Sequence, residues 1–115
     1  MTEPKLRASL WVHAALRRCA VEGITAVVAK KGDADAGTVL VKLYRGEVGC
    51  EVFTQIRDGA GQLAWLRATG PDPVPEERAE SYIARARAVD GDLWVIEVED
   101  RAGRVPFLER ILPAR

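Results

Sequence analysis

The chain has 115 residues, of which 48% are hydrophobic and 30% charged, and its 17 basic residues balance 17 acidic ones. This length allows one domain that buries roughly two-thirds of its unfolded surface, so folding requires neither a disulfide nor a metal. The composition excludes a disordered chain. A net charge of zero argues against a nucleic-acid binder, because such proteins ordinarily carry a basic excess.

The sequence shows no sign of export or membrane insertion. Residues 1–5 lack the basic and apolar regions of a secretory signal. The apolar stretches are far shorter than the roughly 20 residues that span a bilayer. Cys19 and Cys50 lie far apart in the sequence, without the spacing of a redox or zinc motif. We therefore expect a cytoplasmic protein that does not contact a membrane and whose cysteines are buried thiols.

The first predicted element is a helix over residues 6–22, which Gly23 ends. Its main apolar stripe, at helical spacing, is formed by Ala8, Val12, Ala15, Leu16, Cys19 and Ala20. A second apolar flank is formed by Leu6, Leu10, Ala14 and Val21. A helix that is apolar over so much of its circumference is usually covered on more than one side. The second flank therefore indicates a second contact.

Strands are predicted in the next part of the chain. Residues 24–31 are rich in β-forming side chains, and residues 31–37 form a turn. Residues 38–69 alternate between apolar and polar side chains, with turns near 46–47 and 58–61. The pattern predicts a three-stranded antiparallel meander over 38–69, which the strand at 24–31 extends to four strands.

A second helix and a fifth strand complete the domain. Residues 76–89 form a helix with acidic residues in its first turn. Residues 92–99 are apolar on both sides, which is typical of an interior strand. We expect Trp94 and Ile96 to pack against Val12, Leu16 and Cys19. The order α-β-β-β-β-α-β predicts a single α+β domain over 1–115, with an antiparallel sheet of about five strands and two main helices, packed mainly on one face.

Several segments together resemble a known family. They are LWVHAALRR at 10–18, GDADAGTVLVK at 32–42, FTQIRD at 53–58, Trp65, TGP at 69–71, YIAR at 82–85 and DLWVIEVED at 92–100. With them the chain resembles the bacterial family known as domain of unknown function 1491. The resemblance runs from about residue 6 to residue 108 and leaves 109–115 as a C-terminal tail. It implies no activity, ligand or catalytic residue.

The sequence contains no assembled catalytic, cofactor or metal motif. The one histidine, His13, and two distant cysteines do not provide the closely spaced ligands that zinc requires. Ser9 and Ser81 lie on predicted helices, outside any nucleophile elbow. Asp33 and Asp35 lack the remaining ligands of a calcium loop and predict a turn. We therefore expect no catalytic residue, no cofactor and no metal.

One face of the predicted meander mixes aromatic, apolar and polar side chains. With a two-residue turn at 46–47, this face consists of Leu40, Lys42, Tyr44, Glu51, Phe53, Gln55, Arg57 and Leu66. The opposite face would form the core with Val39, Val41, Leu43, Cys50, Val52, Ile56, Leu63 and Trp65. The mixture is typical of a protein interface. It also fits a face that a helix of the same chain covers in part.

From these features we infer a non-catalytic binding module of otherwise unknown function. Its partner would be a second copy of the chain, forming a homodimer, or another protein. The contact would use the mixed sheet face or the second flank of the first helix, because soluble monomers rarely expose large apolar patches.

Two alternatives assign the chain a different function. The first is binding of single-stranded nucleic acid, with bases stacked on a surface formed by Lys42, Tyr44, Phe53 and Arg57. The predicted positions of Arg45 and Arg67 on the opposite face argue against it. The second is an enzyme whose acid–base groups are the carboxylates at the end of the last strand, Glu97, Glu99 and Asp100.

Overall fold

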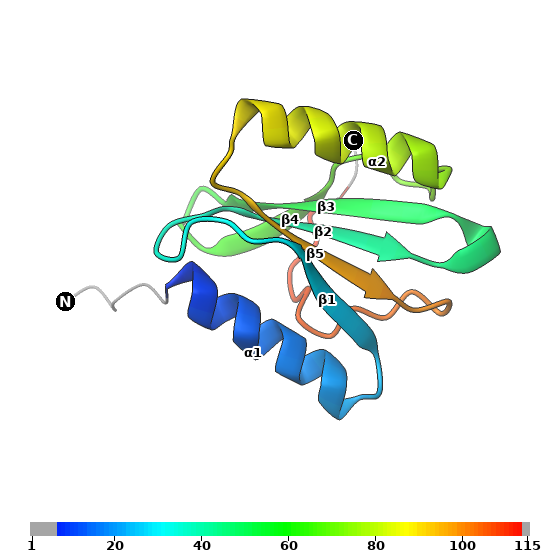
Figure 1. The fold of residues 1–115 in the computed structure, drawn as a ribbon, viewed down its shortest axis with the longest axis horizontal. Coiled ribbons are helices and arrows are strands. Elements are labelled where there is room, and N and C mark those ends of the chain that lie inside the picture. The colour runs from blue at the N-terminus through cyan, green and yellow to red at the C-terminus, as the bar shows by residue number, and fades with distance from the viewer. Residues whose placement is uncertain (1–6, 114–115) are drawn as a thin grey trace.

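The computed structural model describes residues 7–113 and forms a five-stranded sheet between two helices (Figure 1). In chain order the elements are α1 (Ala8–Val21), β1 (Thr25–Lys30), β2 (Val39–Tyr44), the short 3₁₀ helix η1 (Gly46–Val48), β3 (Cys50–Arg57), β4 (Leu63–Arg67), α2 (Glu76–Val89) and β5 (Trp94–Glu99). The predicted α+β class and element order are confirmed. Neither helix of the described residues has the length and apolar character needed to cross a membrane.

The two helices lie on opposite faces of the sheet, so the prediction that both pack mainly on one face is wrong (Figure 1). The physical reason is the composition of β5. Val95 on one side and Ile96 on the other are both buried. A strand that is apolar on both sides needs a covering layer on each face of its sheet.

The sheet is mixed rather than purely antiparallel, with strand order β1-β5-β2-β3-β4. The antiparallel meander of β2, β3 and β4 is present as predicted. β5 is an interior strand, also as predicted, but it lies between β1 and β2, antiparallel to β1 and parallel to β2. β1 is therefore an edge strand and not the first strand of a four-stranded meander.

The pairing of β2 with β3 differs by one residue from the predicted register. The connection spans residues 45–49, and Tyr44 pairs with Cys50 and Lys42 with Val52. Two glycines allow this longer connection, because Gly46 and Gly49 have φ angles of 63° and 115°. A one-residue shift moves every side chain of a strand to the other face. The side chains of β3 therefore point opposite to the predicted directions.

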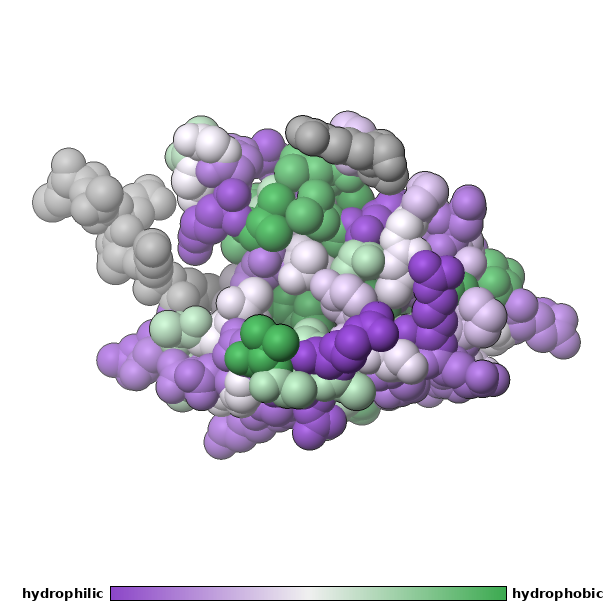
Figure 2. All heavy atoms as spheres, turned by 90° about the horizontal axis from the view of Figure 1, so that it is seen from above, coloured by the Kyte–Doolittle hydropathy of each residue, from purple (hydrophilic) through white to green (hydrophobic). Residues whose placement is uncertain are grey.

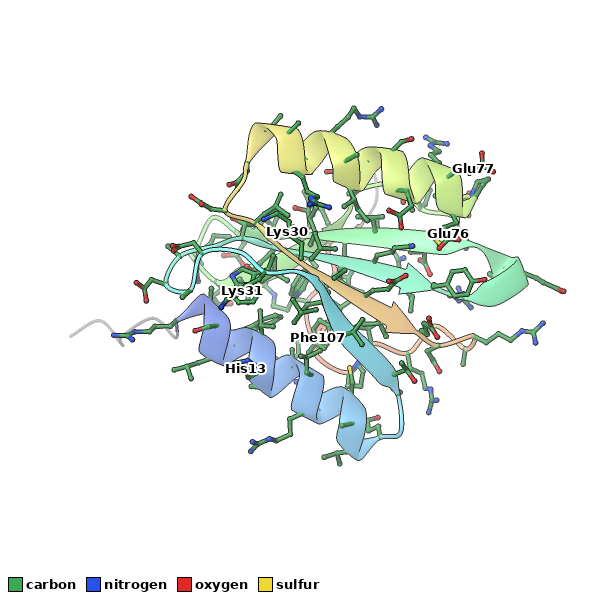
Figure 3. The ribbon with its side chains drawn as sticks, in the orientation of Figure 1. His13, Lys30, Lys31, Glu76, Glu77 and Phe107 are labelled. Atoms are coloured by element: carbon green, nitrogen blue, oxygen red, sulfur yellow. The ribbon has the colours of Figure 1, made fainter. Side chains whose placement is uncertain are left out.

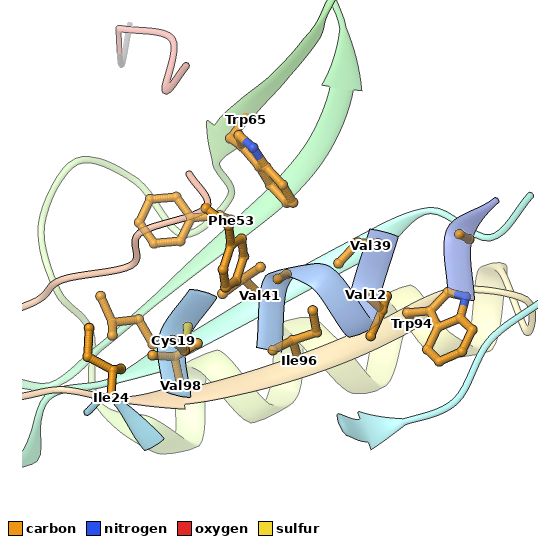
Figure 4. Close-up of a cluster of buried hydrophobic side chains, with 14 residues drawn as sticks. Val12, Cys19, Ile24, Val39, Val41, Phe53, Trp65, Trp94, Ile96 and Val98 are labelled. Carbon is orange, nitrogen blue, oxygen red and sulfur yellow. The ribbon is translucent and has the colours of Figure 1, made fainter. Parts of the chain in front are cut away.

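The sheet separates two apolar cores. The core under α1 contains Val12, Cys19, Trp94 and Ile96 as predicted, with Leu16 partly buried at its border, and the shift of β3 adds Phe53 (Figure 4). The core under α2 consists of Leu40, Cys50, Val52, Val74, Ala79, Ile83, Leu93 and Val95.

The C-terminal segment covers the β4 edge of the sheet. Phe107 is buried in the core under α1. Farther along, the Trp65 backbone N–H donates to the Arg110 carbonyl at 2.8 Å, and the Leu112 N–H donates to the Trp65 carbonyl at 2.9 Å. Residues 110–112 therefore pair with the edge strand, and this part of the predicted tail belongs to the fold.

Candidate functional site

The eight residues predicted to form one interaction surface lie on both faces of the sheet. Leu40, Lys42, Tyr44 and Leu66 face the α2 side, whereas Glu51, Phe53, Gln55 and Arg57 face the α1 side. Leu40 and Phe53 are buried in the two different cores. The prediction of a single mixed face is therefore wrong, and its cause is the register shift of β3. The stacking surface of the nucleic-acid alternative is divided in the same way.

Lys42, whose side chain is buried, is the centre of an ion cluster under α2. Its Nζ donates hydrogen bonds to Glu76 Oε2 at 2.7 Å and to Glu80, and lies 3.1 Å from Glu97 Oε1. Burial acts to lower the pKa of Lys42, but the hydrogen bonds to the three carboxylates outweigh it and raise that pKa above its ordinary value. Lys42 therefore stays charged and joins β2 to β5 and α2. It is not available for a phosphate.

A second buried charge, Glu51, lies on the α1 side. It accepts hydrogen bonds from Arg45 Nη1 at 3.2 Å and from Arg67 Nη1. The Arg67 guanidinium also lies over the Phe53 ring, 5.2 Å from its centroid, in cation–π geometry. Arg45 and Arg67 are thus held by an internal acid and do not form an open basic surface.

The three carboxylates of the enzyme alternative point to separate partners. Glu97 pairs with Lys42 in the buried cluster, and Glu99 is exposed. Asp100 accepts hydrogen bonds from Arg104, with its Oδ1 3.0 Å from Arg104 Nη2. Hydrogen bonds from the Arg104 side chain and backbone hold the pKa of Asp100 below its usual range. The arrangement does not provide a pair of carboxyl groups placed for acid–base catalysis.

The two cysteines are free thiols, buried in different cores as the sequence predicts. Burial raises the pKa of both thiols, because it disfavours the charged thiolate. Neither thiol has the electropositive, partly exposed surroundings of a reactive cysteine.

Metal ligands do not gather in the part of the chain that the structure describes, where no three His, Cys, Asp or Glu side chains form a candidate site. Asp33 stabilises the predicted turn, since its Oδ2 accepts the N–H groups of Asp35 at 3.2 Å and Ala36 at 2.8 Å. His13 is exposed on the side of α1 that faces away from the sheet (Figure 3).

That side of α1, called here the outer face, is the exposed apolar surface that the second flank predicted. It consists of Leu10, His13, Ala14, Arg17 and Val21, which with Arg18 and Glu22 line a shallow groove of about 600 Å³. Leu10 is 53% exposed and Val21 is 80% exposed. Leu6, the fourth residue of the predicted flank, lies outside the described residues.

The sequence prediction missed a cleft beside Trp11, with a volume of about 460 Å³. It lies between the first turn of α1, the loop at 35–38 and the β3–β4 hairpin. Gln55 and Arg57 line it together with Val39. The predicted register placed these two polar residues on the opposite face from Val39 and so concealed the cleft. The signal for it was Trp11, a large aromatic residue beside the main stripe of the helix.

The chain is similar to a family of proteins whose function is unknown. The model of that family, DUF1491, matches residues 6–108. The crystal structure of a DUF1491 family protein from Caulobacter crescentus CB15 is 38% identical, with 94% of this chain and 100% of that chain covered and a TM-score of 0.84. An NMR structure of a DUF1491 family protein from the same organism is 37% identical over 96% of this chain and 100% of that one, with a TM-score of 0.81.

The fold is shared more widely. Protein Atu0922 from A. tumefaciens is 24% identical, over 84% of this chain and 87% of its own, with a TM-score of 0.72. A search of the curated proteins finds no match.

Proposed function

Because the chain belongs to the DUF1491 family of proteins of unknown function, we propose from its surface that it is a non-catalytic binding module that contacts a partner protein through the outer face of α1. The observation that carries this proposal is the joint exposure of Leu10 and Val21. The other large exposed apolar side chains in residues 7–113 each come from a different segment and are Val27, Val48, Leu66, Val89 and Ile111. Seen from the α2 side, hydrophobic residues show in separate patches between hydrophilic ones (Figure 2).

The charges beside the outer face favour an acidic partner. Arg17 lies between Leu10 and Val21 in the sequence of the helix, and His13 and Arg18 border the same groove. Within residues 7–113, Arg17 forms no ion pair, whereas Arg18 pairs with Glu109 at 2.8 Å, and Glu22 is the one acid in the groove. An amphipathic helix with acidic residues beside its apolar stripe would complement this surface in both shape and charge.

A second copy of the chain fits the outer face less well. A two-fold contact between two copies of α1 would bring two basic surfaces together, which opposes association. A helix of 14 residues is about 21 Å long. One face of it provides less than the roughly 800 Å² that each partner buries in a standard interface. The self-association expected from the sequence is therefore an outcome that the test must distinguish.

A cytoplasmic location is part of the same proposal. Its support is the pair of free cysteines in two separate cores. Proteins of oxidising compartments usually pair their cysteines, whereas cytosolic proteins keep them as thiols.

The test uses a fluorescein-labelled peptide with leucines at helical spacing flanked by glutamates, and a control peptide with lysines in place of the glutamates. Fluorescence anisotropy should show binding of the acidic peptide alone. Val21→Ser should weaken this binding about tenfold, as expected for the lost burial of a valine. The matched control is Val89→Ser, because Val89 is also the exposed last residue of a 14-residue helix.

Two results would change the conclusion. Equal binding of the acidic and basic peptides would contradict a charge-selective surface. A wild-type dimer in light scattering at about micromolar concentration that Val21→Ser dissociates and Val89→Ser does not would identify a second copy as the partner.

A further inference from the structure

The cleft beside Trp11 is separate from the outer face of α1. The two surfaces share no lining residue. The volume of about 460 Å³ falls within the roughly 300–1,000 Å³ of small-molecule sites. Because the two surfaces are separate, binding in the cleft does not depend on the proposed protein partner.

Trp11 gives the cleft an apolar wall with a fixed orientation. Its ring centroid lies 5.7 Å from that of Trp65 and 5.6 Å from that of Phe107, with the Phe107 ring edge-on at 88°. Trp65 and Phe107 are themselves buried. They hold the Trp11 indole in place, so it cannot collapse to fill the cleft. Leu63 supplies further apolar lining.

The rim of the cleft is closely packed, and several of its backbone amides are already used. Gly37 is packed so closely that a Cβ atom there would lie 2.5 Å from the Asp92 carbonyl and 2.7 Å from the Trp94 ring. At the start of α1, the Ala8 N–H donates to the Asp35 carbonyl at 3.4 Å, and the Ser9 N–H donates to the Ala34 carbonyl at 2.9 Å. The start of the helix is therefore not an open anion site, and a ligand must be recognised by side chains.

The side chains that remain are hydrogen-bond donors. Arg57 donates one Nη1 bond to the Gly61 carbonyl at 3.0 Å, and a guanidinium carries five N–H donors in all. Within residues 7–113, Arg57 forms no ion pair. Gln55 accepts the Val39 N–H through its Oε1 at 3.3 Å, which leaves its NH₂ group to donate. Asp35 is the one acid of the lining, and it pairs with Arg7 at 3.6 Å.

We infer that this cleft binds a small ligand in which a planar aromatic ring carries a carboxylate. The ring lies against Trp11, where offset or edge-on aromatic contacts stabilise it. The carboxylate accepts hydrogen bonds from the Arg57 fork and the Gln55 amide, and Arg–carboxylate pairs are among the strongest hydrogen bonds in proteins. The preformed wall and rim reduce the entropy lost on binding.

The experiment compares two probes, indole-3-carboxylate and the neutral indole-3-carboxamide, by two-dimensional NMR of the whole chain. The carboxylate should shift the Trp11 indole N–H and the backbone amides of 35–39 and 55–57. It should bind about tenfold more tightly than the carboxamide, the difference expected for a charged hydrogen bond. Arg57→Gln should abolish this difference, and Arg57→Lys should keep part of it, because lysine retains the charge without the fork.

Arg78→Gln, at an exposed arginine of α2, is the matched control and should leave the preference unchanged. Well-dispersed spectra of each variant show that it is folded. Equal affinities of the two probes, shifts located away from the cleft, or no shifts up to about 10 mM probe, near the limit for ligands of this size, would each overturn the inference.

Discussion

Replacing Lys42 with methionine tests whether the buried ion cluster holds α2 on the sheet. The change keeps an unbranched side chain, one atom shorter than that of lysine, and leaves Glu76, Glu80 and Glu97 facing one another without a cation. Removing one partner of a buried ion pair costs about 3–5 kcal/mol. The side chains of Glu76 and Glu80 are 50% and 56% exposed, so water moderates their repulsion. We therefore expect the free energy of unfolding to fall by about 3 kcal/mol, at the low end of that range.

Urea unfolding followed by tryptophan fluorescence measures this loss, and the melting temperature should fall by about 10 °C. Lys31→Met is the control, because it removes the same charge from an exposed lysine. Its effect should stay within about 0.5 kcal/mol. The raised pKa of Lys42 means that its contribution is complete at neutral pH and is lost only as pH rises into the strongly alkaline range.

Glu97→Gln completes the test, because it should change the free energy of unfolding in opposite directions in the wild type and in the Lys42→Met protein. In the wild type it removes a partner of Lys42 and should destabilise the fold. In the Lys42→Met protein it removes one of three repelling carboxylates and should restore about 1 kcal/mol. The same sign in both backgrounds, or a Lys42→Met protein as stable as the wild type, would refute the role assigned to the cluster.

Three further predictions concern other parts of the fold. Trp94→Ala should cost about 3–5 kcal/mol in urea unfolding, because it empties a large site in the core under α1; unchanged melting would place Trp94 outside that core. Cys19 and Cys50 should react slowly with a thiol reagent until denaturant is added, since both are buried with raised pKa values; rapid labelling of the native protein would reverse this. In the folded state the pKa of Asp100 lies below its ordinary value of 3.8. The stability that its carboxylate contributes is therefore present above pH 3.8 and is lost as pH falls through the lower pKa of the folded state. Asp100→Asn should therefore reduce the fall in the free energy of unfolding below about pH 4. The same pH dependence in the variant and the wild type would contradict the bond to Arg104.

The elements could be predicted from the sequence because each depends on a local pattern. The helix over 76–89 has the predicted bounds, since its acidic first turn and the Asp90-Gly91 stop lie within a few residues of its ends. The placement of the two helices needed a longer argument. β5 is apolar on both sides, which already required a covering layer on each face of the sheet. An interior β5 and two helices on one face were therefore incompatible predictions.

The register of β3 could not be read from alternation alone. Residues 48–57 alternate equally well in either register, and one residue in the connection decides which face they occupy. The burial of Lys42 is a different case, because its three partners come from α2 and β5. Only the spacing of Glu76 and Glu80, one helical turn apart beside Ala79, indicated that α2 carries two acids toward the sheet.

The balanced charge of the chain has a structural meaning that its composition does not reveal. Part of the charge is paired within the fold, by Lys42 with its three glutamates and Glu51 with two arginines, and part is paired at the surface, by Asp58 with Arg110 and Asp100 with Arg104. Arg17 and Arg57 differ, because within residues 7–113 neither forms an ion pair and each borders accessible apolar side chains. An unpaired guanidinium beside an apolar surface is a combination that binds amphipathic, negatively charged groups. Arg17 and Arg57 are therefore the residues through which the two proposed contacts would bind a negatively charged group.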